Sequence, residues 1–409
     1  MNQADFPLLN TTHLAWLDNA ATSQKPQAVL TAMTDFYSTT NANVHRGIYR
    51  LSEQATAAYE AVREQTRQLI GAASTTEIIF TSGATAGLNL LANALSSYVL
   101  KPDDVILLTP AEHHSNLVPW QLQAARYGAK LEFLPMRTDT TLDLATLANR
   151  LHDRVKLVAL AHIANATGTV HDIQTIIQQA RQRSIPVVID AAQSVPHRSI
   201  NVQQLDCDFL VWSGHKMCGP TGTGVVYGKQ AWLEQLPPWQ GGGNMIRTVF
   251  LDHATWNDLP YKFEAGTPNI AGVIGLGAAI KYLQTLGFDQ IQASTETVYH
   301  YLLDQLATLD FVQVLGPTDR TQRSSIASFV VPGVHPHDVA QILDQHNVAV
   351  RAGHHCAQPL LRQLAIPATT RASVYFYNTT ADIDQLVIGL KQVYSTFHGY
   401  LSRTNSGAL

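Results

Sequence analysis

The middle of the chain alternates short apolar runs with amphipathic stretches, and this rhythm constrains the possible fold most strongly. The apolar runs predict strands at Glu77–Thr81, Val105–Thr109, Leu131–Pro135, Lys156–Ala161, Val187–Asp190 and Phe209–Trp212. The stretches between them predict helices at Ala84–Ala94, Ser115–Tyr127, Leu144–Leu151 and Asp172–Arg183. Because strands connected through helices pair in parallel, we expect an α/β fold whose mostly parallel sheet is covered on both faces. Upstream, apolar periodicity predicts a helix over Ser52–Ile70, which Ser52 is able to cap.

The alternation of predicted strands and helices ends after about Gly228, where a Pro- and Gly-rich loop begins. A long helix is predicted from Ile270 to Leu283, and another follows Phe288. The remaining strands are fewer and separated, at Val312–Leu315, Ile326–Val331, Ala349–Val350 and Ser373–Tyr375, with a closing helix near Ile383–Tyr394. We therefore expect an N-terminal segment (1–23) lying over one domain or the other, a large domain (24–285) and a smaller α+β domain (286–409).

Bulk properties narrow the class of protein. The 409 residues are 45% hydrophobic and 14% charged, which suits two well-packed domains rather than a disordered chain. A net charge of −4 without a basic arm argues against nucleic-acid binding. The sequence lacks a signal-like start and an apolar run of about 18 residues, which argues against membrane insertion. Three scattered cysteines, Cys207, Cys218 and Cys356, do not make a disulfide framework, so we expect a cytoplasmic enzyme with reduced thiols.

The densest polar cluster, Trp212–Gly222, directly follows an apolar strand and contains Lys216. The carboxyl end of a strand in an open α/β sheet is where ligands bind. A lysine in a closed pocket there has a lowered pKa and can form a Schiff base, while Ser213 and His215 suit a phosphate. The alternative is a surface turn with an ordinary solvated lysine.

Asp190 ends the preceding apolar strand. It could cap a helix, bind a metal, or pair with a pyridinium nitrogen so that the ring acts as an electron sink. An aspartate and a lysine at the ends of neighbouring strands are what a pyridoxal-phosphate site needs, and this context weakens the solvated-lysine alternative.

Two further turns carry polar chemistry. The Gly-rich turn Thr81–Gly87 joins a strand to a helix and offers an anion site, which alone is a weak signal. His113 and His114 follow another strand. They could bind zinc, but no further ligand stands at a suitable spacing, so stacking of one imidazole on a cofactor ring fits better.

Taken together, these residues resemble the class V, fold-type I pyridoxal-phosphate enzymes, and within them the group II cysteine desulfurases of the SufS type. The resemblance runs from Leu17 to Ser373 and is strongest in separate motifs that occur in the family's order. These are Asn43–Gly47, Glu112–Asn116, Ser213–Lys216, Phe263–Pro268 and Arg351–Cys356. It implies a large domain with a seven-stranded, mostly parallel sheet, a smaller C-terminal domain carrying the cysteine loop, and a homodimer with sites at the subunit interface.

The resemblance also implies roles for single residues. Lys216 matches the lysine that binds pyridoxal 5'-phosphate, Cys356 the cysteine that receives sulfur, and His113 the histidine that stacks on the ring. The other cofactor contacts it implies are Asp190 at the pyridine nitrogen, Gln193 at the phenolate oxygen, and Thr85, Ala84, Ser213, His215 and Thr267 around the phosphate. The substrate contacts it implies are Arg371, Asn165, Arg46 and Ala21, with Thr267 and Arg46 reaching in from the other subunit. No metal site is implied.

Two departures from the family pattern stand out. Ala84 occupies a position where the family often has a second threonine, so one side-chain donor is missing although the backbone remains. Cys218 is not part of the motif, and we expect it, like Cys207, to be a packing residue. For Arg371, the simpler alternative is a surface salt bridge.

The implied activity is conversion of L-cysteine to L-alanine with a persulfide on Cys356, which supplies sulfur for iron-sulfur cluster assembly. The implied partner is a sulfur acceptor of the SufU or SufE type. Three alternatives remain: a selenocysteine lyase on the same scaffold, another class V reaction that does not need Cys356, and a non-catalytic sulfur-trafficking protein.

Overall fold

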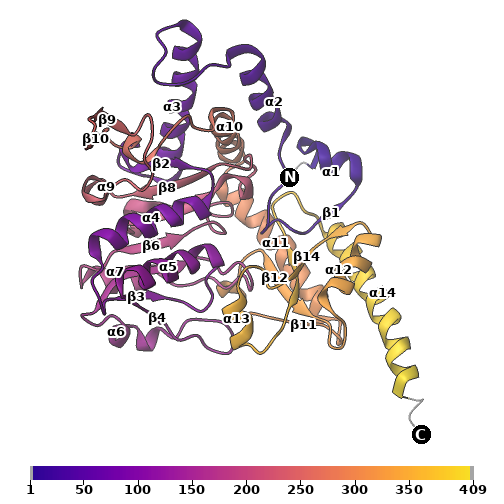
Figure 1. Ribbon diagram of the computed structural model, residues 1–409. Helices are drawn as coiled ribbons and strands as arrows, with labels where there is room; N and C mark the ends of the chain where they lie inside the picture. Colours follow the sequence, from indigo (N-terminus) through magenta and orange to yellow (C-terminus); the bar gives the residue numbers. More distant parts are fainter. Residues whose placement is uncertain (1–2, 406–409) are drawn as a thin grey trace.

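A seven-stranded sheet forms the centre of the protein, as a computed structural model that describes residues 3–405 shows (Figure 1). Its strands lie in the order β2-β8-β7-β6-β5-β3-β4. Their bounds are β2 Ile78–Thr81, β3 Val105–Leu108, β4 Lys130–Phe133, β5 Val155–Ala161, β6 Val187–Asp190, β7 Phe209–Ser213 and β8 Gly224–Gly228. The five strands from β7 to β4 pair in parallel, and β8 is antiparallel to both β2 and β7. The predicted fold class and the seven strands are confirmed.

Strand β8 is the member of this sheet that sequence periodicity missed. Its apolar stretch is only Val225–Tyr227, between two glycines, and is too short to show a period. The strand packs closely on a helix, because a Cβ at Gly87 would lie 2.6 Å from a methyl carbon of Val226. A glycine is therefore needed where the helix crosses the strand.

Helices cover both faces of the sheet (Figure 1). They are α3 Arg50–Ile70, α4 Ala84–Val99, α5 Val118–Tyr127, α6 Leu147–Arg150, α7 Ile173–Arg181, α8 Val202–Leu205, α9 Gln230–Gln235 and α10 Ile270–Leu286. Alternate side chains of β6 enter two different apolar clusters, Val187 and Ile189 on one face and Val188 on the other. The expectation that Ser52 caps α3 is wrong, since α3 begins at Arg50 and the Ser52 hydroxyl donates to the Asn43 carbonyl 2.7 Å away.

The C-terminal part contains a separate four-stranded antiparallel sheet in the order β11-β12-β15-β14. Its strands are β11 Gln313–Val314, β12 Ile326–Val330, β14 Arg351–Gly353 and β15 Thr369–Ser373. Its helices are α11 Phe288–Ala307, α12 Pro336–Gln345, α13 Gln358–Gln363 and α14 Thr380–Asn405. Helices α10 and α11 meet at an angle of 79°, next to the domain limit predicted at 285/286. The division into these three parts stays a prediction.

The N-terminal segment spans both parts of the protein. It comprises α1 Pro7–Thr12 and β1 Ala15–Trp16, and α2 Gln27–Asp35 follows it. Strand β1 pairs in parallel with β13 (Val348–Ala349) of the C-terminal part. A few residues later, the Thr22 hydroxyl donates to the carbonyl of His215 in the large sheet's ligand turn, 3.0 Å away. The segment therefore connects the two halves rather than covering one of them. A short hairpin, β9 Ile246–Val249 and β10 Ala254–Trp256, projects from the large domain.

Among the described residues, no single helix is both long and apolar enough to cross a membrane. The bent pair α10 and α11 passes that test of length and composition when taken together.

A buried ion pair fixes the segment that leads to Thr267. Arg63 of α3 binds both carboxylate oxygens of Glu264, at 2.7 and 3.0 Å, and both side chains are at most 5% exposed. Glu264 also accepts the backbone N–H of Phe80 at 2.7 Å. A buried charge whose partner is removed is strongly destabilising, so each member depends on the other.

We predict that Arg63→Met lowers the free energy of unfolding by about 3–5 kcal/mol, because Glu264 is left buried and unpaired. Urea denaturation followed by circular dichroism measures this change. Lys130→Ala is the matched control, since Lys130 and Asp103 form a solvent-exposed pair and its loss should leave the stability nearly unchanged. Equal effects of the two substitutions would contradict the prediction.

Candidate active site

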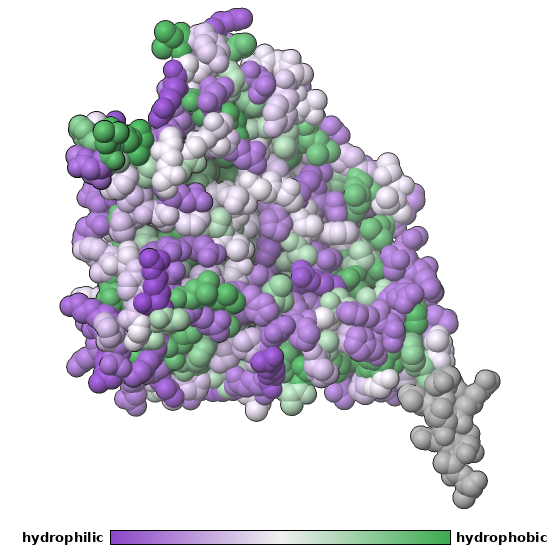
Figure 2. Space-filling model, in the orientation of Figure 1, coloured by the Kyte–Doolittle hydropathy of each residue, from purple (hydrophilic) through white to green (hydrophobic). Residues whose placement is uncertain are grey.

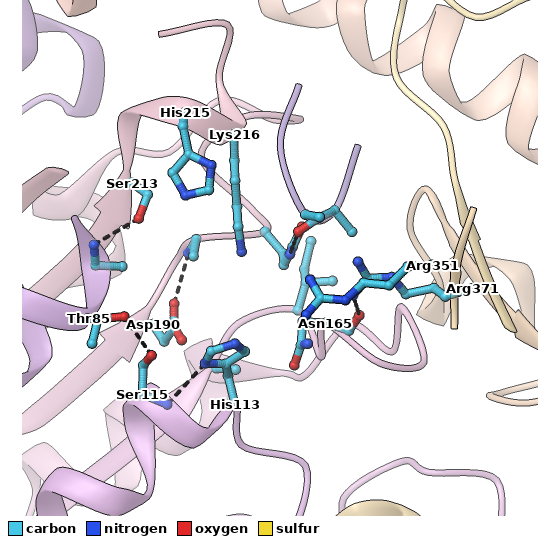
Figure 3. A pocket seen from close by; sticks show the side chains of 17 residues that line it. Thr85, His113, Ser115, Asn165, Asp190, Ser213, His215, Lys216, Arg351 and Arg371 are labelled. Atoms are coloured by element: carbon cyan, nitrogen blue, oxygen red, sulfur yellow. Dashed lines mark hydrogen bonds between the residues drawn. The ribbon is translucent and has the colours of Figure 1, made fainter. Parts of the chain in front are cut away.

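A cavity of about 760 Å³ lies at the carboxyl ends of β5, β6 and β7, which is where an open α/β sheet binds ligands. Figure 3 shows side chains from both halves of the protein pointing into it. Its lining includes Ala21, Ala84, Thr85, His113, Asn165, Asp190, Gln193, Ser213, His215, Lys216 and Arg371, all predicted from the sequence. It also includes Ala20, Ser115, Ala161, Ile163, Ala192 and Arg351.

Lys216 enters the cavity from the short turn Gly214–Lys216 that follows β7 (Figure 3). Burial lowers the pKa of its amine from 10.5 to about 8, and Arg371 and Arg351 lower it further while Asp190 opposes the shift. A substantial fraction of the amine is therefore neutral near physiological pH, as a nucleophilic lysine requires.

Asp190 lies on the strand next to the one that carries Lys216. Strands β6 and β7 are parallel, with Asp190 in register with Val211, so both strand ends reach the same edge of the sheet. One carboxylate oxygen of Asp190 accepts the backbone N–H of Ala192 at 3.0 Å. Burial raises the pKa of this carboxyl, and the Ala192 N–H and the Lys216 charge oppose that shift. The side chain is thus poised to pair with a cation inside the cavity.

The start of α4 forms one wall of the cavity. Gly83, with φ of 153°, precedes the helix, and the N–H of Ala84 donates to the Ser213 hydroxyl at 2.8 Å. The Thr85 hydroxyl lies 2.7 Å from that of Ser115. Hydroxyl groups at a helix N-terminus bind anions such as phosphate. The absence of a threonine at position 84 leaves the backbone N–H in place, as expected.

His113 faces the cavity from the turn after β3. Its Nδ1 accepts the backbone N–H of Ser115 at 3.0 Å, so a neutral ring carries its proton on Nε2. Burial, reinforced by Lys216, lowers the pKa of His113 to about 3. The imidazole is therefore neutral, which suits both stacking on a ring and proton transfer through Nε2.

Beneath His113, the buried Glu112 carboxylate holds the turn in place. It accepts hydrogen bonds from Thr109, from Asn116 at 2.6 Å and from the Ala161 backbone N–H at 3.2 Å. Burial raises the pKa of Glu112 to about 8. These contacts link the end of β3 to the end of β5.

Arg371 is buried at the opposite side of the cavity, on β15. Its guanidinium donates to the Asn165 carbonyl at 2.9 Å and pairs with Asp18 at 3.2 Å, so the surface salt bridge considered above is excluded. Burial lowers the pKa of Arg371 to about 10, and the group stays charged at neutral pH. Among the described residues, its Nε and the Oδ1 of Asn165 have no hydrogen-bond partner. Buried polar atoms are rarely left unsatisfied, so both are available to a ligand.

Cys356 lies at the edge of this site in a turn between β14 and α13. Its Sγ is 3.9 Å from an Nη atom of Arg351, which lines the cavity. The Cys356 carbonyl accepts the N–H of His114 at 2.7 Å, and the His114 ring accepts the N–H of Gln358 at 3.2 Å. The turn is therefore attached directly to the segment that carries His113.

The backbone of this turn adopts an unusual conformation. His355 and Cys356 have φ values of 51° and 55°, a region that residues other than glycine seldom occupy. Asn165 holds the His355 carbonyl at 2.6 Å, and Thr369 binds its ring at 2.8 Å. A backbone in this region persists where surrounding contacts fix it.

Cys356 borders the cavity without being part of its lining, and two other predicted residues lie elsewhere. Arg46 and Thr267 are exposed and line a smaller cavity of about 440 Å³ together with Asn43, Val44, His45, Gly243, Asn244, Gly266 and Pro268. Within one chain they are brought near each other but not near Lys216. This arrangement does not test their predicted action on the site of another subunit.

Sequence reasoning had no role for Ser115 and did not place Arg351 in the cavity. Ser115 lies within the recognised motif Glu112–Asn116, which was the available signal. Arg351 was part of the cysteine motif, but its distance from Lys216 along the chain hides their proximity. Cys207 and Cys218 are fully buried, as expected of packing residues.

The residues of the cavity fit pyridoxal phosphate. Lys216 supplies an amine for its aldehyde, Asp190 a carboxylate for its ring nitrogen, and the α4 end an anion site for its phosphate. The unsatisfied Nε of Arg371 remains to donate to a substrate carboxylate, and the unsatisfied Oδ1 of Asn165 remains to accept from a substrate N–H. Among the side chains that the structure describes (residues 3–397), no three of His, Cys, Asp or Glu are grouped to hold a metal ion.

Comparison with known proteins places the chain among similar sequences and structures. Residues 15–386 match the model of the aminotransferase class-V family. A probable cysteine desulfurase of Halalkalibacterium halodurans is 47% identical over 396 residues, covering 96% of this chain and 97% of the relative. A cysteine desulfurase of Serratia proteamaculans is 46% identical over 396 residues, with the same coverage of both chains.

Solved structures of cysteine desulfurases are also similar to this chain. The apo structure of a cysteine desulfurase from Thermococcus onnurineus superposes with a TM-score of 0.93 at 39% identity, covering 96% of this chain and 97% of that one. The cysteine desulfurase CsdA of Escherichia coli, in an S-sulfonic acid form, gives a TM-score of 0.90 at 39% identity, with coverage of 96% and 98%.

We predict that Lys216 of the cofactor-free protein reacts with a small amine-acylating reagent with a pH midpoint near 8. Peptide mass spectrometry measures the extent of acylation at each pH. Because the Asp190 charge raises the pKa of Lys216, Asp190→Asn should move the midpoint to lower pH. A midpoint near the ordinary value of 10.5 would show that burial does not activate this amine.

Proposed function

The chain belongs to the class-V aminotransferase family, and we propose that it works as a cysteine desulfurase through Lys216, which holds pyridoxal 5'-phosphate, and Cys356, which takes the sulfur. It converts L-cysteine to L-alanine. The observation that carries the residue assignments is the convergence of Lys216, Asp190, His113 and Arg371 on one cavity, with Cys356 attached to its edge.

The substrate is oriented by groups at the C-terminal side of the cavity. The guanidinium of Arg371 binds the substrate carboxylate through its free Nε, and the free Oδ1 of Asn165 beside it accepts from a donor of the substrate. Ala21 lines the same wall. The pairing of Arg371 with Asp18 and with the Asn165 carbonyl keeps the guanidinium fixed before substrate arrives.

The residues that bind the cofactor line the same cavity. Bound pyridoxal phosphate withdraws electrons from the amino acid and so weakens the bonds at its Cα and Cβ atoms. Asp190 would keep a proton on the ring nitrogen, and Gln193 would bind the ring's phenolate oxygen. Thr85, Ser213, His215 and the backbone at Ala84, whose N–H donates to Ser213 in this structure, would hold the phosphate. His113 would stack on the ring.

Protons are moved by two groups whose pKa burial has lowered. Lys216, with a pKa of about 8, takes the Cα proton and returns a proton to the product. Neutral His113, protonated on Nε2, moves a proton to or from the substrate sulfur.

Sulfur transfer takes place on Cys356. Its thiolate attacks the sulfur of the bound cysteine, so that an S–S bond forms as the Cβ–S bond breaks. The electron pair of the broken bond stays with the carbon fragment, which gains protons and leaves as alanine. The transferred sulfur is oxidised to the persulfide level and Cβ is reduced, so the step needs no external oxidant. Arg351, 3.9 Å from Sγ, stabilises the thiolate.

A second copy of the chain completes the site. Arg46 and Thr267 are exposed and remote from Lys216 within one chain, yet both belong to motifs of the family. Large apolar side chains are exposed nearby, with Ile48 at 95%, and again at the β9–β10 hairpin, where Leu251 is fully exposed. Figure 2 shows the apolar surface over that hairpin. Exposed apolar groups of this kind favour a homodimer in which each subunit contributes to its partner's site.

The persulfide of Cys356 passes to a sulfur acceptor of the SufU or SufE type in the cytoplasm and supplies iron-sulfur cluster assembly. The partial exposure of Cys356 and the resemblance to SufS-type enzymes support this role.

We predict that Cys356→Ser lowers alanine formation from L-cysteine by at least about 100-fold, since the hydroxyl does not replace the nucleophilic thiolate. Mass spectrometry should find one added sulfur on Cys356 of the wild type. Cys207→Ala is the matched control, because Cys207 is buried away from the cavity. It should retain both alanine formation and the added sulfur on Cys356. Wild-type alanine production by Cys356→Ser would contradict the assignment. If Cys356→Ser loses activity on cysteine but keeps full activity on selenocysteine, a selenocysteine lyase is favoured.

Mixed dimers test the contribution of the second copy. Lys216→Ala and Arg46→Ala should each be inactive, whereas mixing the two after mild denaturation should restore activity. A mixed dimer contains one site with both an intact Lys216 and an intact Arg46. Alanine formation by the mixture measures this recovery. If the mixture is no more active than its components, Arg46 acts within its own chain.

A further inference from the structure

The stretch Thr22–Lys25, which connects β1 to α2, wraps around the turn that carries Lys216. Its donors converge on one acceptor, the carbonyl oxygen of His215, which belongs to the peptide bond between His215 and Lys216. The Ser23 N–H, the Ser23 and Thr22 hydroxyls and the Lys25 ammonium lie 3.1, 3.1, 3.0 and 2.9 Å from this oxygen. A carbonyl oxygen has two lone pairs, so four donors exceed what its satisfaction requires.

The same stretch holds the other side of Lys216. The N–H of Cys218 donates to the Ser23 hydroxyl at 2.8 Å, and Cys218 has a φ of 64°. The Lys25 ammonium also donates to the Ser23 carbonyl and to the Thr22 hydroxyl at 3.4 Å, which ties the stretch to itself. Hydrogen bonds therefore fix the backbone both before and after the lysine.

Lys25 lacks a counter-ion. Among the side chains that the structure describes (residues 3–397), no carboxylate lies within ion-pair distance of its ammonium. Burial lowers its pKa to about 8. A partly buried charge without a partner is costly, whereas its hydrogen bonds to neutral acceptors are stronger than those of a neutral donor. The three hydrogen bonds of the Lys25 ammonium offset part of this cost.

The stretch is also connected to the substrate side of the cavity. Asp18 pairs with Arg371, and the N–H of Ala20 donates to the Ser373 hydroxyl at 2.9 Å. Residues 18–25 thus contact both the arginine of the C-terminal sheet and the turn that carries the lysine of the large sheet. A shift of this segment would move the two groups relative to each other.

We propose that Lys25 is a positioning residue that acts through the His215 carbonyl to fix how Lys216 and the His215 side chain enter the cofactor cavity. The proposal rests on the function assigned to Lys216. Lys25 itself contacts neither cofactor nor substrate, since it is not part of the cavity lining.

The test compares Lys25→Met with Lys229→Met. Lys229 is the control because it is also a partly buried lysine bound to a backbone carbonyl, that of Asp206 at 3.0 Å. Unlike Lys25, it pairs with the Asp206 and Asp208 carboxylates and has no hydrogen bond to the Lys216 turn. Pyridoxal phosphate is titrated into each cofactor-free protein by its visible absorbance. The visible circular dichroism of the bound cofactor, which reports its orientation and not global stability, is recorded together with urea denaturation.

For Lys25→Met we expect the dissociation constant of pyridoxal phosphate to rise about tenfold, with a weakened visible dichroism band. Lys229→Met should leave both unchanged. The proposal is overturned if Lys25→Met binds within about twofold of the wild type with an unchanged band, or if the two variants behave alike. Should Lys25→Met fail to fold, Ser23→Ala removes the hydroxyl between Cys218 and His215 and must alter the same two measurements, or the proposal fails.

A separate experiment distinguishes failure of this proposal from failure of the function on which it rests. Lys216→Ala must lose the yellow absorbance of the covalently held cofactor. If it does not, the assignment of Lys216 is wrong regardless of the Lys25 result. If it does, and Lys25→Met still binds and orients the cofactor like the wild type, only the positioning role is wrong.

Discussion

The parallel pairing of β6 with β7 is the constraint on which the site depends. Because Asp190 is in register with Val211, the carboxylate at the end of one strand and the lysine in the turn after the next reach the same edge of the sheet. The other groups are placed relative to this pair. His113 follows β3, and Arg371 comes from the separate sheet of the C-terminal part. A cavity is formed where these elements meet, and it takes its chemistry from groups that are far apart along the chain.

Burial sets the protonation of that cavity. It lowers the pKa of Lys216 to about 8, so that a fraction of its amine is neutral near neutral pH, and it lowers the pKa of His113 to about 3, so that its imidazole is neutral. The same burial lowers the pKa of Arg371 only to about 10, which leaves a cation for the substrate carboxylate. Burial thus places a group that can act as a base, Lys216, beside a group that stays positively charged, Arg371. Asp190 opposes the lowering of the pKa of Lys216.

The sequence was most informative where a pattern is local. The alternation that predicted the strands depends on neighbouring residues, and β6 was predicted with its observed bounds. Strand β8 escaped because its apolar stretch lies between glycines. The roles of single residues needed the family resemblance, since no spacing shows that Asn165 lies beside Arg371. The grip of Thr22–Lys25 on the lysine turn was not predicted, because it joins segments some 190 residues apart.

The catalytic account joins two claims, a lysine that holds the cofactor and a cysteine that stores the sulfur, and the lysine determines everything that follows. Reduction of the cofactor-loaded protein with borohydride, followed by peptide mapping, locates the covalent link directly. The account predicts that the reduced cofactor is attached to Lys216 alone, and that less of it is attached there when borohydride is added during turnover of L-cysteine. Attachment to Lys25 or to any other lysine, or the absence of a covalent link in active protein, would contradict it.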